Sequence, residues 1–171
     1  MSKAAFSVDV NNLFNSYMRK FPGKRVDYKL LLERANQIAP VVRATAYGFQ
    51  NSQEVEGFIN RLRQLGYDTR FKKPRLVEEE NKKFKTFDWN VGICMDVVRL
   101  VTSGRVDTTI IGSSDPELVP LLQWVHGHGI RTIILSAGIG RELKNAADQF
   151  EEIGESYFEL ASQKEVKPEG K

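Results

Sequence analysis

The sequence predicts an α/β fold: a three-layer α/β/α sandwich around a mainly parallel, doubly wound sheet. The first observation behind this prediction is that short apolar runs alternate with amphipathic, helix-like segments along almost the whole chain. The second is that neither an internal repeat nor a low-complexity segment interrupts the alternation. Because crossovers between parallel strands are right-handed, few topologies remain, and most of them are doubly wound. The length of 171 residues is typical of one domain with a sizeable core.

Apolar runs and capping residues define the elements expected in the first half of the chain. The expected order is strand 4–10, helix 27–39, strand 41–49, helix 52–66 and strand 67–73. Asp27 is a good N-cap for the first of these helices, and Pro40 stops it. Ser52 and Gly66 are suitable caps for the second.

The second half continues the alternation after a polar segment. The expected order is a long loop or small hairpin at 74–86, helix 90–104, strand 107–113, helix 116–129, strand 131–137, helix 140–149 and a short edge strand at 150–153 or 157–161. Pro116 suits the first turn of its helix, whereas Pro120 would kink that helix if it lay beyond the first turn. Residues 1–163 are expected to form a single domain, and residues 164–171 a polar, frayed tail.

The composition is that of an ordinary soluble globular protein, with 41% hydrophobic and 27% charged residues. No apolar run approaches the roughly 20 residues that span a bilayer, and the first apolar stretch is too short for a signal peptide, so no membrane association is expected. Cys94 is the only cysteine, which excludes an internal disulfide and favours a reducing cytoplasm. A zinc site built on several thiolates is excluded too, and the two histidines alone cannot make one.

The distribution of charge says more than the net charge of +3. Two basic groups flank an acidic run: Lys72, Lys73 and Arg75 before it, Lys82, Lys83 and Lys85 after it, with Glu78, Glu79 and Glu80 between. From this feature alone a solvated loop of mixed charge is the favoured interpretation. A flap that contacts phosphates is the alternative.

Two predicted strands end in polar and acidic residues. The strand at 4–10 runs into Asp9, Asn11 and Asn12, and the strand at 107–113 runs into Asp115 and Glu117. Ligands of doubly wound sheets bind beyond the carboxyl ends of the strands, where the strand order reverses. If the two strands are neighbours, their carboxylates face one crevice, and Asp96, which interrupts an apolar helix, is a further candidate.

Such a cluster predicts a hard metal ion. Several carboxylates in one crevice repel each other unless a cation is present. Oxygen ligands without histidine or cysteine favour Mg²⁺ or Mn²⁺ over zinc. A metal of this kind activates a water and polarises a phosphate, so the pattern favours phosphoryl chemistry.

Each of these residues also has a simpler interpretation. Asp115 suits a helix N-cap, and Glu117 suits a first helical turn. Asp9 and Asn12 suit a turn stabilised by their own backbone, and Asp96 suits a partly exposed helix. The coincidence of all of them at predicted strand ends favours a site.

Four separated motifs resemble one known family. The stretches are "FSVDVNNLF", "WNVGICMDVVRL", "DTTIIGSSDPELVPLLQWVHGHGIRTIIL" and "LKNAADQFEEI". In order and spacing they resemble NYN domains, particularly the LabA-like branch, which belong to the PIN-like nuclease superfamily. The resemblance covers residues 5–153 and implies a PIN-like sandwich with metal-dependent ribonuclease activity.

The resemblance assigns roles to individual residues. It places the acids that would hold one or two Mg²⁺ or Mn²⁺ ions at Asp9, Asp96, Asp115 and Glu117. Asn12 would orient a metal-bound water or a phosphate, and Ser113 and Ser114 would donate to phosphate oxygens. The chain departs from the family pattern at three positions: Asn90 stands where many relatives have Asp, Ser114 replaces Gly, and Glu117 replaces Asp.

RNA is the expected partner under this interpretation. Lys83, Lys85 and Arg141 are expected to hold the nucleic-acid backbone. Phe84 and Phe87 suit base stacking as well as they suit core packing, whereas core packing is favoured for Trp89. A homodimer remains open, because no apolar excess requires one.

Three other functions are alternatives, and two of them are disfavoured. A catalytically weak or inactive NYN-fold module that binds nucleic acid or protein is the main alternative. A haloacid-dehalogenase-type phosphatase needs a second Asp two residues after the first, where this chain has Asn11. A response-regulator receiver needs a Lys at the end of the fifth strand, and "IILSAG" has none.

Overall fold

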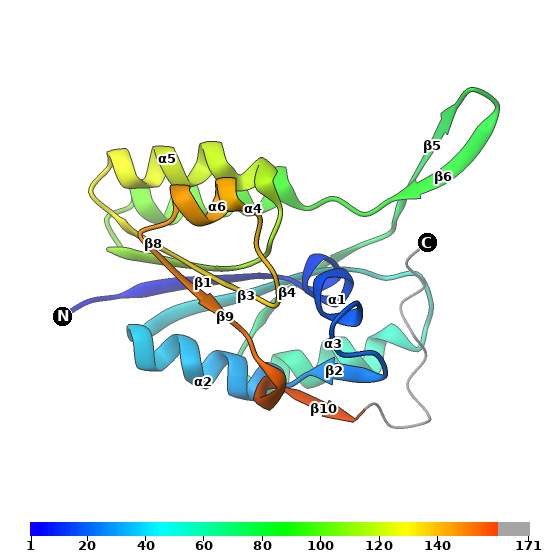
Figure 1. The fold of residues 1–171 in the computed structure, drawn as a ribbon, viewed down its shortest axis with the longest axis horizontal. Helices are drawn as coiled ribbons and strands as arrows, with labels where there is room; N and C mark the ends of the chain where they lie inside the picture. The colour runs from blue at the N-terminus through cyan, green and yellow to red at the C-terminus, as the bar shows by residue number, and fades with distance from the viewer. Residues whose placement is uncertain (161–171) are drawn as a thin grey trace.

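The computed structural model describes residues 1–160 and is drawn in Figure 1. The strands are β1 (Ala4–Asp9), β2 (Lys24–Val26), β3 (Val41–Phe49), β4 (Asp68–Lys72), β5 (Arg75–Glu79), β6 (Lys82–Thr86), β7 (Thr108–Gly112), β8 (Arg131–Ser136), β9 (Gln149–Glu152) and β10 (Phe158–Leu160). The helices are α1 (Val10–Met18), α2 (Tyr28–Ile38), α3 (Val55–Gln64), α4 (Asn90–Thr102), α5 (Val119–Gly127) and α6 (Arg141–Ala146), with 3₁₀ turns η1 (Pro116–Leu118) and η2 (Glu155–Tyr157). No helix within residues 1–160 has the length and apolar character needed to cross a membrane.

The central sheet has six strands in the order β4-β3-β1-β7-β8-β9, and every neighbouring pair is parallel. Strands β1, β3 and β4 extend the sheet in one direction, and β7, β8 and β9 extend it in the other. The strand order therefore reverses between β1 and β7, which are hydrogen-bonded neighbours. The prediction of a doubly wound, mainly parallel α/β sheet is confirmed.

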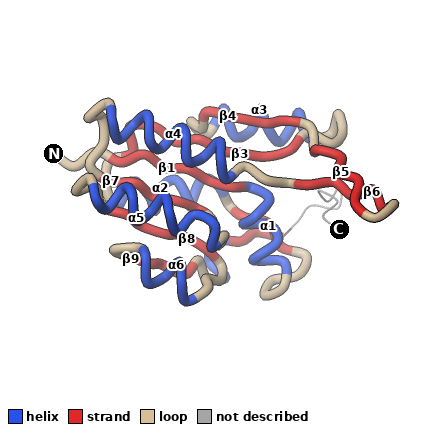
Figure 2. Tube along the Cα trace, turned by 90° about the horizontal axis from the view of Figure 1, so that it is seen from above, coloured by secondary structure: helices blue, strands red, loops and turns tan. Residues whose placement is uncertain are grey.

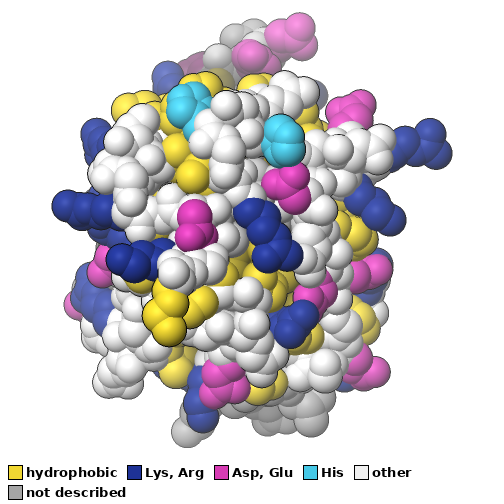
Figure 3. All heavy atoms as spheres, turned by 90° about the vertical axis from the view of Figure 1, so that its left-hand side faces the viewer, with side chains coloured by type: hydrophobic (Ala, Val, Ile, Leu, Met, Phe, Trp, Pro, Cys, Tyr) yellow, Lys and Arg dark blue, Asp and Glu magenta, His cyan; other side chains and the backbone are white. Residues whose placement is uncertain are grey.

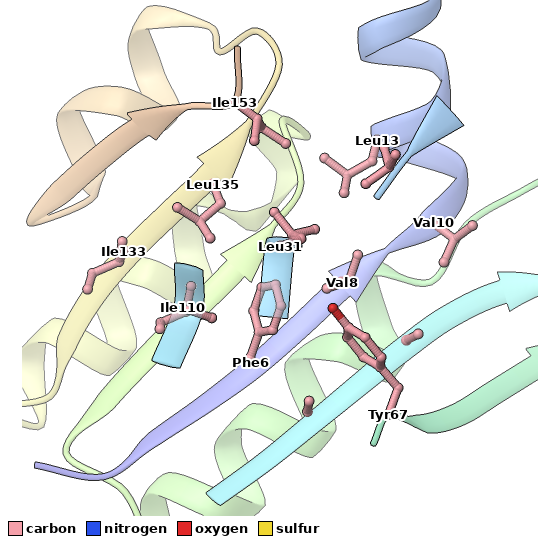
Figure 4. Packing of buried hydrophobic residues seen from close by; sticks show 14 of the residues in the cluster. Phe6, Val8, Val10, Leu13, Leu31, Tyr67, Ile110, Ile133, Leu135 and Ile153 are labelled. Carbon is pink, nitrogen blue, oxygen red and sulfur yellow. The ribbon is translucent and has the colours of Figure 1, made fainter. Parts of the chain in front are cut away.

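Helices cover both faces of this sheet. Residues of α1, α2 and α3 pack on one face in a core cluster with Phe6 and Val8 of β1, and Figure 4 shows Leu13 and Leu31 of these helices approaching the sheet. Residues of α4, α5 and α6 form the second cluster on the other face, around Ile111 of β7. Every residue of β1 is buried because both of its faces are covered. Figures 1 and 2 show the resulting three layers.

Capping explains where several predicted elements begin and end. The Asp27 carboxylate accepts hydrogen bonds from the backbone N–H groups of Lys29 and Leu30, so α2 begins where the sequence predicts. The predicted helix at 116–129 divides into η1 and α5. This division places Pro120 in the first turn of α5, where its missing N–H leaves no hydrogen bond unmade.

The polar segment between β4 and α4 is a hairpin of β5 and β6. Its two-residue turn consists of Glu80 and Asn81, whose φ angles are +47° and +65°. Positive φ angles at both positions match the right-handed twist of the two strands of a hairpin. The hairpin projects from the body at the end of the sheet where β1 leads into α1 (Figures 1 and 2). Of the two alternatives left open at 74–86, the hairpin is therefore correct.

Two elements, α1 and β2, were not predicted, and strands occur at both of the positions offered for the last strand, 150–153 and 157–161. Helix α1 and strand β2 lie in a stretch whose polar residues gave no clear period. Strand β9 is the expected edge strand of the central sheet, while β10 pairs antiparallel with β2 in a separate small sheet. The predicted tail at 164–171 lies outside the described residues.

Candidate functional site

A cavity of about 370 Å³ opens at the carboxyl ends of β1 and β7, where the strand order reverses. Its lining residues come from the end of β1, from α1, from the segment that joins β6 to α4, from the first residue of α4, and from η1 with the residue before it. They are Asp9, Asn11, Asn12, Asn15, Phe87, Asp88, Asn90, Asp115, Pro116 and Glu117. The predicted strand-end carboxylates therefore do meet around one cavity.

Asp9 is the most buried carboxylate of this cavity, with an exposed fraction of 5%. It ends β1 and caps α1: its Oδ1 accepts a hydrogen bond of 3.0 Å from the backbone N–H of Asn12. Burial, with a smaller contribution from the charges of Asp115 and Asp88, raises the pKa of Asp9 to about 6. The cavity thus holds a carboxyl whose pKa lies well above the ordinary value of an aspartate.

Asp115 and Glu117 follow β7 and share one hydrogen-bond donor. Asp115 caps η1, because its Oδ1 accepts from the backbone N–H of Glu117 at 2.9 Å. The side-chain amide of Asn90 donates from Nδ2 to Asp115 Oδ2 at 2.9 Å and to Glu117 Oε2 at 3.2 Å. Two carboxylates from the β7 end therefore converge on the first residue of α4.

Asn12 joins the two halves of the site. Its Oδ1 accepts hydrogen bonds from the backbone N–H and the hydroxyl of Ser114, at 2.8 and 3.0 Å. The hydroxyl of Ser113 is fully buried and accepts from the backbone N–H of Asp115 at 3.2 Å. The structure places neither Ser113 nor Ser114 in the lining of the cavity, and their hydrogen bonds fix the loop that carries Asp115.

The structure does not bring Asp96 into the cavity. Its Oδ2 accepts from the hydroxyl of Tyr47 at 3.0 Å and lies 2.8 Å from Nε of Arg70 in an ion pair. The reason is helical geometry: six residues beyond Asn90, a side chain points about 240° around the helix and lies about 9 Å along it. Asp96 therefore faces β3 and β4, and Asn90 takes the cavity position of α4.

We expect Asp96→Asn to lower the free energy of unfolding by about 1–3 kcal/mol, because it weakens hydrogen bonds to a charged partner. The same variant should bind Mn²⁺ as the unchanged chain does, since Asp96 does not line the cavity. Urea unfolding and Mn²⁺ titration measure the two quantities. A loss of Mn²⁺ affinity in this variant would show that Asp96 contributes to the metal site, as the sequence predicted.

The basic residues predicted to hold a nucleic acid lie outside the cavity. Lys83 and Lys85 are exposed on β6 of the hairpin, and Arg141 is exposed at the start of α6. The hairpin nevertheless leads directly into Phe87 and Asp88, which line the cavity. At the opposite end of the molecule, positive and negative side chains alternate without a continuous patch of either (Figure 3).

Several lining residues were not predicted as site residues, and Asp88 and Asn90 are the two among them that form hydrogen bonds at the start of α4. Asp88 accepts a hydrogen bond from the backbone N–H of Asn90 at 2.7 Å and lines the cavity beside it. An Asp just ahead of a predicted helix that starts at this end of the sheet was the available signal. The only signal at Asn90 is its departure from the family pattern that the sequence resembles. Trp89 packs as expected, with its indole N–H donating to the carbonyl of Gly48 at 2.7 Å.

The donors of the cavity decide which metal it suits. Within residues 1–160, no group of three or more Asp, Glu, His or Cys side chains lies close enough together to hold a metal ion. Asp115 and Glu117 do converge, and Mg²⁺ is commonly held through one or two carboxylates and several waters. The oxygen donors therefore fit a hydrated Mg²⁺ or Mn²⁺ and do not fit an ion enclosed by protein ligands.

Comparison with known proteins adds a family to this geometry. The family model of the NYN domain matches residues 3–154. A solved structure of a protein of unknown function from Vibrio parahaemolyticus has a TM-score of 0.79 at 24% sequence identity, over 92% of this chain and 96% of that one. That likeness concerns the fold alone. A comparison with curated proteins gave no match.

Proposed function

The chain belongs to the NYN domain family, within the PIN-like nuclease superfamily, and on that premise we propose that it is an Mg²⁺- or Mn²⁺-dependent ribonuclease of the LabA-like branch. One observation carries the proposal. Asp9 from the end of β1, and Asp115 and Glu117 from the end of β7, line one cavity where the strand order of the sheet reverses. Ligand sites of doubly wound sheets form at this position.

The carboxylates have different tasks in this proposal. Asp115 and Glu117 would hold the cation, with Asp9 as a third acid on the β1 side of the cavity. A bound cation of this kind lowers the pKa of a water and polarises the phosphodiester. Asn12 keeps the loop with Asp115 in register with α1 through its bonds to Ser114.

The hairpin of β5 and β6 is the proposed holder of the RNA strand. Lys83 lies opposite Glu78 in the strand register, whereas Lys85 lies opposite the apolar Leu76. Lys85 therefore has no acid directly across the hairpin and is the better phosphate contact. Phe84 precedes Lys85 in β6, so it points to the other face of the hairpin; it is 43% exposed there, which suits stacking of an unpaired base.

The double variant Phe84→Ala and Lys85→Ala is expected to raise KM for single-stranded RNA about 10-fold or more, because base stacking alone contributes about 1–3 kcal/mol per base. The value of kcat should change little, since neither residue lines the cavity. Steady-state cleavage kinetics measure both. Lys83→Ala is the matched control and should have a smaller effect. An equal rise in KM for the control would show only a general charge effect.

The test of the proposed function is cleavage of end-labelled single-stranded RNA by the purified chain. Reactions with Mn²⁺, with Mg²⁺ and with EDTA separate metal-dependent cleavage from contamination, and single-stranded DNA of the same sequence tests the choice of RNA. Cleavage with a cation and none with EDTA is expected. Absence of cleavage under every condition would sink the enzymatic proposal.

A second candidate is a non-catalytic module that kept the fold and binds nucleic acid or protein. The observation in its favour is that the side-chain amide of Asn90 already donates hydrogen bonds to both Asp115 and Glu117. RNA binding that does not depend on a cation, together with no cleavage, would favour this candidate.

A further inference from the structure

Asn90 occupies an unusual position for a neutral side chain. Its Nδ2 donates to carboxylate oxygens of both Asp115 and Glu117, at 2.9 and 3.2 Å. The side chain is 9% exposed, and its Oδ1 is buried without a hydrogen-bond partner. Buried amide oxygens in native structures are nearly always paired, so this unpaired atom needs an explanation.

The orientation of the amide follows from chemistry. The reverse orientation would aim Oδ1 at two carboxylate oxygens and would lose both hydrogen bonds, whereas the observed one gives each carboxylate a donor. The cost of this choice is the unpaired Oδ1. The two carboxylates therefore determine how the amide is turned.

The start of helix α4 does not explain the side chain. The backbone N–H of Asn90 donates to Asp88 Oδ1 at 2.7 Å, and the unpaired Oδ1 of Asn90 accepts from no backbone N–H, so the side chain does not cap the helix. The side chain of Asn90 thus has a role that concerns Asp115 and Glu117.

We infer that Asn90 sets the affinity of the cavity for a divalent cation. Its Nδ2 holds Asp115 and Glu117 together in the absence of a cation, so a cation held by these two carboxylates would have to compete with the amide. If the amide rotated, its unpaired Oδ1 would be available as a neutral oxygen ligand. Asn90 is therefore a positioning residue that makes the metal-free form stable and metal binding weak. This inference rests on the proposed function, since the same carboxylates are the proposed metal ligands.

The test compares Mn²⁺ binding to the full chain and to three variants by electron paramagnetic resonance, with thermal unfolding measured in EDTA and in Mn²⁺. Asn90→Asp should lower the Kd for Mn²⁺ by about 10-fold or more, the scale seen when groups next to metal ligands are changed. Its unfolding temperature should fall in EDTA and recover with Mn²⁺. Asn90→Ala should also lower the unfolding temperature in EDTA, because Asp115 and Glu117 lose their shared donor.

Asn11→Asp is the matched control. Asn11 lines the same cavity, and the substitution adds the same charge. Asn11→Asp should change the Kd much less than Asn90→Asp. Equal gains from both variants would show that any added charge suffices, and no gain from Asn90→Asp would overturn the inference.

A direct readout on the unchanged chain does not depend on any variant that folds poorly. The side-chain amide resonances of Asn90 should shift on titration with Mg²⁺ more than those of Asn11, and unchanged Asn90 resonances at saturation would also overturn the inference. Because these measurements report cation binding alone, they remain informative if RNA cleavage is absent. The inference and the proposed function can therefore fail separately.

Discussion

Asp115→Asn is expected to lower cation-dependent RNA cleavage by about 10²–10³-fold, the loss typical of removing one electrostatic contact to a reacting group. Asp115 is one of the two carboxylates that converge at the end of β7, so its charge has the largest expected effect on cation binding. Asparagine retains an oxygen that can accept the hydrogen bond from the backbone N–H of Glu117, so the N-cap of η1 is preserved. Cleavage kinetics with Mn²⁺ measure the loss.

The control for this variant lies at the other end of the same strand. Asp107 directly precedes β7 and binds the hydroxyl of Ser2, whereas Asp115 follows β7. Asp107→Asn makes the same chemical change far from the cavity and should leave cleavage unchanged. Cleavage by Asp115→Asn at the rate of the unchanged chain would show that the reaction does not use this cavity.

The sequence predicted the middle of the sheet well because its central strands are buried on both faces. An apolar run such as that of β3 signals a covered parallel strand, and the extent of β3 agrees with its predicted range of 41–49. Whether the strands at 4–10 and 107–113 are neighbours was left open, and the pairing of β1 with β7 is what brings Asp9 and Asp115 to one cavity.

The unpredicted parts depend on tertiary contacts. Helix α1 is rich in asparagine, and it forms because Asp9 caps it and because Leu13 and Tyr17 pack into the core. Asp88 lies at the cavity because the β5–β6 hairpin leads the chain out after β4 and back to the carboxyl ends of the strands before α4. Asp96 lies outside the cavity because it occupies a different face of α4 from Asn90. A linear motif alone does not say which face of the helix points to the cavity.

Asp9→Asn is expected to stabilise the protein at pH 7.5 in EDTA, by up to about 3 kcal/mol. Asp9 is nearly fully buried, and its pKa is raised from 3.8 to about 6. A carboxyl whose pKa is raised in the folded chain favours folding at pH values below its ordinary pKa of 3.8. This contribution is lost as the pH rises through the folded-state pKa of about 6. Above about pH 6 the unchanged chain must therefore keep a buried charge, at about 1.4 kcal/mol per pKa unit. Asparagine has no charge to bury.

Urea unfolding at several pH values tests this expectation. The variant should exceed the unchanged chain in unfolding free energy at pH 7.5, and the difference should shrink between pH 6 and pH 4 as Asp9 is protonated. The N-cap is conserved, because an asparagine oxygen also accepts from the backbone N–H of Asn12. A difference that persists at pH 4 would trace the effect to packing and not to charge. The same variant should lose cation-dependent cleavage. The charge of Asp9 would then lower stability at neutral pH and also be required for the reaction at the cavity.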